Sequence, residues 1–83
     1  MTDSRKISSK IDELLSERDE GGTICPSEVA RALGGEDWRE MMQPVREVAA
    51  TRAQRGELAV TRQGVPVDPG NPGGPIRLGR PPS

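Results

Sequence analysis

The segment that decides the fold runs from residue 26 to residue 53 and reads PSEVARALGGEDWREMMQPVREVAATRA. Its first part predicts a helix, because a proline at the first helical position costs no hydrogen bond. Glu28 follows in the first turn, where a carboxylate is favoured by the helix dipole. The buried face of this helix would carry Val29, Ala30 and Leu33. Gly34-Gly35 then ends it after about two and a half turns.

A second helix is predicted from Asp37 to about residue 53, where Asp37 and Glu40 have the spacing of a capping box. An apolar stripe at helical spacing runs through it: Trp38, Met41, Met42, Val45, Val48 and Ala49. Pro44 interrupts this stripe, because an interior proline loses a hydrogen bond and clashes with the preceding turn. Either the helix kinks there, or a short helix 37–42 precedes a main helix from Pro44. We favour one helix with a kink or tight break, because the apolar phase continues, and Gly56 ends it.

The residues before this segment predict another helix and a short strand. Apolar residues fall on one stripe with a period of 3.6: Ile7, Ile11, Leu14 and Leu15. Asp3 or Ser4 can cap the helix, and Gly21 and Gly22 stop it. Thr23–Cys25 is β-branched and lies between Gly22 and Pro26, which favours a brief extended segment.

The residues after Gly56 predict a β wing. Leu58–Arg62 alternates apolar and polar residues, and Gln63-Gly64 is a turn signal. Val65 and Val67 are expected to be extended, because Val65 and Asp68 each precede a proline. Residues 68–75 form a loop by composition, and residues 76–78 form the returning strand.

This order of elements predicts an α+β fold, mostly α, of the winged helix-turn-helix type. It has three helices, a short first strand and a two-stranded wing, with the Gly34–Asp37 turn at helix-turn-helix length. Eighty-three residues fit one domain, which we place at residues 1–79, with residues 80–83 as a fraying tail.

Composition argues against most enzyme classes and against a membrane span. The chain has no histidine and a single cysteine, Cys25, so it lacks the commonest general base and metal ligand and any cysteine pair. We therefore expect no catalysis, no cofactor, no metal and no small-molecule substrate. No apolar run approaches the length of a membrane span or a signal peptide, so a cytoplasmic location is expected.

Charge is divided unevenly along the chain, whose net charge is −1. Residues 1–51 carry seven basic and eleven acidic side chains, and residues 52–83 carry five arginines and two acids. In a helix-turn-helix the second helix enters the major groove. The candidate contacts on the helix from Asp37 are Arg39, Gln43 and Arg46, and those on the wing side are Arg62, Arg77 and Arg80. Glu40 and Glu47 flank the helical set and would repel phosphates, so an ordinary solvated face is the competing interpretation.

Three other residues have a structural and a functional interpretation. Cys25 precedes a helix-starting proline, where the helix dipole favours a reactive thiolate, but a packed residue or N-cap is the simpler interpretation. Trp38 is expected in the core, since it is the one aromatic residue and lies on an apolar stripe. Arg52 is expected to lay its stem along the core edge and pair with an acid.

The chain also resembles a known family in its sequence motifs. These are Ile24-Cys-Pro-Ser-Glu-Val-Ala-Arg-Ala-Leu33, Trp38-Arg39, Met42, Val45-Arg46, Ala49, Gly56, Thr61-Arg62-x-Gly64, Val67-Asp68-Pro69 and Gly74-Pro75-Ile76-Arg77-Leu78. They are similar to a small bacterial family of domains of unknown function with a winged-helix-like fold. The likeness covers roughly residues 7–79; it implies the fold and no activity.

Two functions remain open at this point. The first is a small winged-helix-like module that binds DNA through the helix from Asp37 and the wing, a partner suggested by fold analogy. The alternative is a protein-interaction or homodimerisation module without nucleic-acid binding. The acidic first half of the chain and the mixed charge of the third helix favour this alternative.

Overall fold

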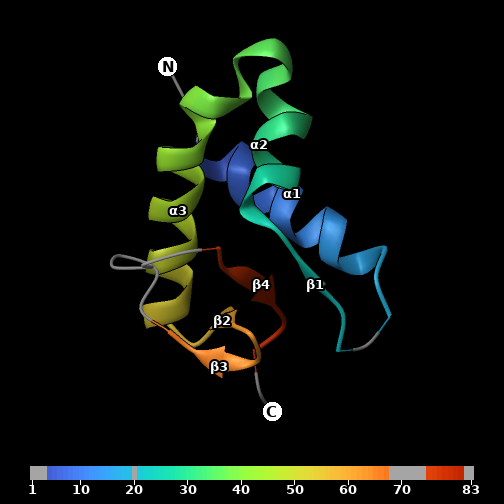
Figure 1. Ribbon diagram of the computed structural model, residues 1–83, viewed down its shortest axis with the longest axis vertical. Helices are drawn as coiled ribbons and strands as arrows, with labels where there is room; N and C mark the ends of the chain where they lie inside the picture. Colours follow the sequence, from blue (N-terminus) through green and yellow to red (C-terminus); the bar gives the residue numbers. More distant parts are fainter. Residues whose placement is uncertain (1–3, 20, 68–74, 82–83) are drawn as a thin grey trace.

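The protein has an α+β fold, mostly helical, with a small antiparallel sheet, as expected from the sequence. This computed structural model describes residues 4–19, 21–67 and 75–81. The elements in chain order are α1 (Ser4–Ser16), β1 (Thr23–Ile24), α2 (Pro26–Gly34), the 3-10 turn η1 (Gly35–Asp37), α3 (Trp38–Gln54), β2 (Ala59–Arg62), β3 (Val65–Pro66) and β4 (Arg77–Gly79). In Figure 1, α2 and α3 stand side by side, α1 crosses behind them, and β2, β3 and β4 lie at the end opposite η1.

The prediction of three separate helices is wrong in one respect, because α2, η1 and α3 follow one another without a break. Within the described ranges the helical residues therefore form two continuous stretches, 4–16 and 26–54. The turn at Gly35 needs a positive φ of 56°, which glycine adopts without strain. Asp37 occupies the N-cap position of α3, but its side chain makes no capping hydrogen bond. Its ψ of 23° is not the extended backbone that a capping box uses.

Helix α1 ends at Ser16, earlier than the glycine pair at 21–22 that was expected to stop it. The Ser16 hydroxyl donates to the carbonyl of Glu13 at 2.6 Å, a local bond that competes with helix continuation. The amides of Glu17 and Arg18 then bond to carbonyls three residues back, which tightens the last turn. Asp3, the other predicted cap of this helix, lies outside the described residues.

Helix α2 starts as the sequence predicts, with Cys25 at the N-cap and Pro26 at the first helical position. The Glu28 carboxylate accepts the Cys25 backbone N–H at 2.6 Å, so an orphan donor is satisfied. Helix α3 continues through Pro44, as favoured above, and ends one residue later than predicted. Gly56, with a φ of 75°, lets the amide of Glu57 return to the carbonyl of Arg52 at 2.9 Å.

The sheet has four strands in the order β1-β4-β2-β3, all paired antiparallel. The predicted pairing of residues 58–62 with residues 76–78 is confirmed, with Val60 opposite Leu78. The two-stranded wing is incomplete as a description, because β4 also pairs with β1 and β2 also pairs with β3. The predicted loop 68–75 lies outside the described residues except for Pro75.

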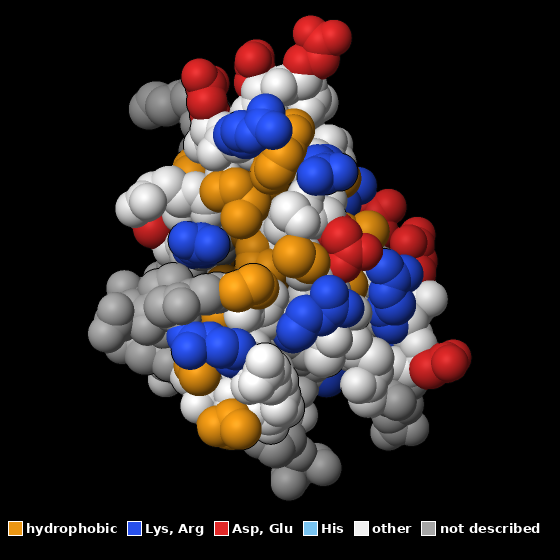
Figure 2. Space-filling model, viewed as in Figure 1, with side chains coloured by type: hydrophobic (Ala, Val, Ile, Leu, Met, Phe, Trp, Pro, Cys, Tyr) orange, Lys and Arg blue, Asp and Glu red, His pale blue; other side chains and the backbone are white. Residues whose placement is uncertain are grey.

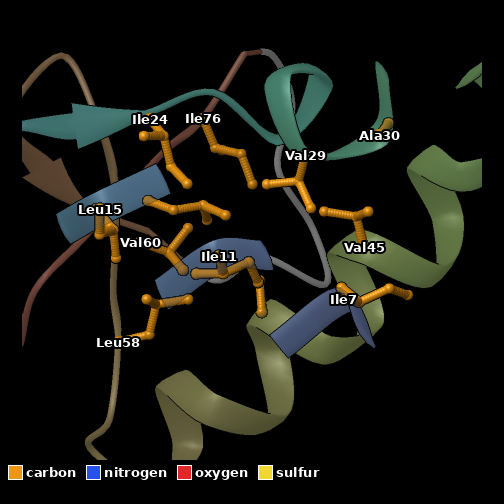
Figure 3. Close-up of a cluster of buried hydrophobic side chains, with 12 residues drawn as sticks. Ile7, Ile11, Leu15, Ile24, Val29, Ala30, Val45, Leu58, Val60 and Ile76 are labelled. Atoms are coloured by element: carbon orange, nitrogen blue, oxygen red, sulfur yellow. The ribbon is translucent and has the colours of Figure 1, made fainter. Parts of the chain in front are cut away.

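The core is aliphatic and joins all three helices to the inner face of the sheet (Figure 3). Its buried residues are Ile7, Ile11, Leu15, Ile24, Val29, Ala30, Val45, Ala49, Leu58, Val60, Ile76 and Leu78. Trp38 was expected inside this core, but it is half-buried and packs against the edge of the cluster. An indole is so large that tryptophan is rarely buried completely.

Candidate nucleic-acid interface

The three candidates on α3 lie on one side of the helix, because positions 39, 43 and 46 are spaced by four and three residues. Arg39 and Gln43 are exposed, whereas Arg46 is half-buried. The Gln43 amide nitrogen donates to the Glu47 carboxylate at 3.3 Å, so this side chain is partly engaged. One of the acids expected to flank this surface therefore contacts a candidate side chain directly.

Arg39 stacks on the indole of Trp38 rather than pairing with an acid. Its guanidinium carbon lies 4.8 Å from the ring centroid, and that of Arg31 from α2 lies 4.4 Å away. These are cation–π distances, and each contact is worth about 0.5–1 kcal/mol at an exposed site. The sequence did not single out Arg31, because it lies in another helix seven positions before the tryptophan, and no local pattern links the two.

Arg77 is engaged by the neighbouring strand. Its Nε donates to the hydroxyl of Thr23 and its Nη2 donates to the Thr23 carbonyl, each at 3.0 Å. Arg77 thereby fastens the middle strand β4 to the edge strand β1 across the outer face of the sheet.

Arg80 closes the end of α1. Its Nη2 donates to the carbonyl of Leu15 at 2.8 Å, and its Nη1 donates to the carbonyl of Asp19 at 3.2 Å. Carbonyls at a helix C-terminus lack intrahelical partners, and a cation there is also favoured by the dipole. Arg80 was placed in a fraying tail, but here it joins the C-terminal segment to the first helix.

Arg46 on α3 and Arg62 on β2 differ from the other candidates. Both are half-buried, and the Nε atom of each is buried without a hydrogen-bond partner. Neither makes an ion pair within residues 4–19, 21–67 and 75–81. Their stems are thus held by packing while their charge is not neutralised by the protein, an arrangement suited to an external anion.

Acidic residues lie at the η1 end of the surface that carries the α3 candidates. Glu36, Asp37 and Glu40 are all exposed, at η1 and the first turn of α3. Figure 2 shows acidic side chains at this upper end and Lys and Arg side chains on both sides of a hydrophobic band below it. The start of α3 is therefore the part of this surface least favourable for phosphate.

The other residues discussed from the sequence have structural partners. Arg52 pairs with Asp12 at 2.9 Å and Glu57 at 3.5 Å, with its side chain 15% exposed, as expected for a stem along the core edge. Cys25 is half-buried at its N-cap and accepts a hydrogen bond from the Ser27 hydroxyl at 3.1 Å.

The described residues also bear on two other classes of site. They contain no group of three or more His, Cys, Asp or Glu residues placed to hold a metal ion. Among these residues, no helix is both long enough and apolar enough to span a membrane.

Comparison with known proteins gives a family without a function. No curated protein matches the chain. One family model matches residues 4–81, which is nearly the whole sequence, and its description names no activity, ligand or partner. The chain belongs to the family described as "Protein of unknown function (DUF3253)".

Proposed function

We propose that this chain is a non-catalytic binding module of the winged-helix type that contacts the phosphate backbone of duplex DNA. Two features support the fold assignment. The helices α2 and α3 follow each other through a three-residue turn, as in a helix-turn-helix. The strand β4 returns between β1 and β2, so the wing is built into the sheet beside the helices.

The observation that carries the DNA proposal is the state of Arg46 and Arg62. They come from the two elements that such a module presents to DNA, the second helix of the motif and the wing. Each has a packed stem and a guanidinium with no acidic partner in the described chain. Arg39 adds a third cation on the same side of α3, supported by the Trp38 ring.

The contacts of the remaining arginines determine how strong and how sequence-specific the proposed DNA binding is. Arg77 and Arg80 are used by Thr23 and by the end of α1, so they add little to a phosphate surface. Few contacts remain, and the acids around η1 oppose insertion of the helix start into a groove. We therefore propose side-on binding to the DNA backbone, weak and without strong sequence preference.

The second candidate is a protein-interaction or homodimerisation module, and the Arg31–Trp38–Arg39 stack favours it. Trp and Arg are the residue types enriched at the energetic centres of protein interfaces. The exposed acids at Glu36 and Glu40 would then meet a basic partner. Light scattering after size exclusion separates these cases, because a dimer at high concentration supports self-association and a monomer excludes it.

A fluorescence anisotropy titration with a labelled random-sequence duplex tests the DNA proposal. At about 50 mM salt we expect saturable binding that is lost by about 200 mM, since counterion release dominates such contacts. Arg46→Gln should weaken it several-fold, and Lys6→Gln, which removes the same charge from an exposed site on α1, should not. Absence of binding at the lower salt concentration would reject the proposal.

A further inference from the structure

A cavity of about 400 Å³ lies between the first turns of α1 and the second half of α3. This volume is within the range of small-molecule sites in proteins. In Figure 1 the start of α1 lies beside α3, where the two helices meet. The α1 side contributes Ser4, Arg5 and Ser8. The cavity does not include Arg39, Arg46, Arg62, Arg77 or Arg80; it adjoins the DNA surface proposed above only through Glu47, which contacts Gln43.

Three of the lining residues are arginines, from both helices, and one is an acid. They are Arg5, Arg52, Arg55 and Glu47. Hydroxyl groups make up most of the remaining lining, and Val48 gives an apolar contact. Guanidinium groups together with hydroxyls are the donors that proteins use for phosphate oxygens.

Arg52 is held in place before any ligand arrives. Its Nη1 contacts the Asp12 carboxylate at 2.9 Å and the Ser8 carbonyl at 3.5 Å, and its Nε faces Glu57 at 3.5 Å. Nη1 therefore has two partners, whereas the buried Nε makes no hydrogen bond, and Nη2 is left for a further acceptor. A donor fixed in this way loses little conformational entropy when a ligand binds.

The positive charge of Arg52 is partly neutralised by Asp12 and Glu57, so Arg55 provides the main positive charge for an anion. It follows the last residue of α3, is exposed, and has no acidic partner in the part of the chain that the structure describes. Thr51, one turn earlier, donates its hydroxyl to the Glu47 carbonyl at 3.1 Å, so this hydroxyl is not a donor to the anion. Arg55 therefore has the freedom to close over a bound anion.

We propose that this cavity binds a small phosphate-bearing molecule, with the phosphate held between Arg52 and Arg55 and the rest of the molecule against Val48. A phosphate fits better than a carboxylate, because several guanidinium groups match its higher charge and larger number of acceptor oxygens. Glu47 opposes the anion from the same wall, and this makes it a specific test of where the anion lies.

The test is a titration of the full chain with inorganic phosphate at constant ionic strength, followed by amide chemical shifts in NMR spectra. We expect saturable shifts concentrated at residues 4–8 and 47–55. Arg55→Gln should weaken binding roughly two- to fivefold, and Glu47→Gln should strengthen it by a similar factor. Lys6→Gln is the control, because it removes a neighbouring exposed charge that does not line the cavity, and it should leave the affinity unchanged.

Three outcomes would overturn the proposal. The first is shifts spread over all arginines without saturation. The second is an affinity that does not respond to Glu47→Gln, and the third is acetate binding as tightly as phosphate. The result is independent of DNA binding, because the duplex titration depends on Arg46 and Arg62.

Discussion

Replacement of Ile11 by Ala is expected to lower the free energy of unfolding by about 3–4 kcal/mol. Ile11 is completely buried on α1 and belongs to the cluster that joins the helices to the sheet (Figure 3). Its truncation removes transfer free energy and leaves a cavity that close-packed neighbours fill only in part. An 83-residue domain has a total stability of about 4–12 kcal/mol, so this loss is a large share of it.

Urea denaturation followed by circular dichroism measures this change. Ile11→Val is the matched control, because it removes one methyl group and should cost about 0.5–1.5 kcal/mol. If the alanine variant lost no more than the valine variant, Ile11 would not lie at the centre of the core.

Leu78→Ala is expected to cost about 3 kcal/mol, within the range for buried leucines. Leu78 lies on the middle strand β4 with no exposed surface. Its register neighbours are Ile24 on β1 and Val60 on β2, so one side chain supports both strand pairs from the same face. The truncation should therefore loosen the whole sheet rather than one hairpin.

Thr61→Ala is the control for this prediction, since Thr61 is the next residue along β2 and points to the opposite face of the sheet. Substitutions of this kind usually change stability by less than about 0.5 kcal/mol. An equal cost for the two variants in denaturant unfolding would contradict the central position of β4.

The helices were predictable from local patterns. The spacing of Ile7, Ile11 and Leu15 identified the buried face of α1, and Pro26 with Glu28 located the start of α2. These signals act within one or two turns, so they can be found without knowing the fold. The same locality explains the error at the end of α1, where the hydrogen bonds of Ser16 and the two following amides, rather than the glycine pair, decide the boundary.

The sheet was predictable only in part. Residues 63–64 form a two-residue turn with positive φ at both positions, and glycine at the second was the visible signal. Val65 was expected to be extended, but the pairing of β3, which contains Pro66, with β2 was not predicted. The sheet accepts this proline at the edge, where a missing N–H needs no partner.

The candidate site was changed most by contacts distant in sequence. Arg77 bonds to Thr23 and Arg80 bonds to Leu15, over 54 and 65 positions respectively. Neither contact can be inferred from the spacing or the charge of neighbouring residues. In the sequence, both arginines therefore resembled free surface cations. The fold therefore narrows the proposed phosphate contacts to Arg46 and Arg62, with Arg39 beside them.

The dependence of DNA affinity on salt in the Arg46→Gln/Arg62→Gln variant tests this conclusion most directly. Each phosphate contact contributes about 0.9 to the slope of log affinity against log salt concentration. The account predicts that the variant's slope is about 1.8 shallower than that of the unmodified protein, with Lys6→Gln unchanged. An equal slope in the double variant and the unmodified protein would contradict it.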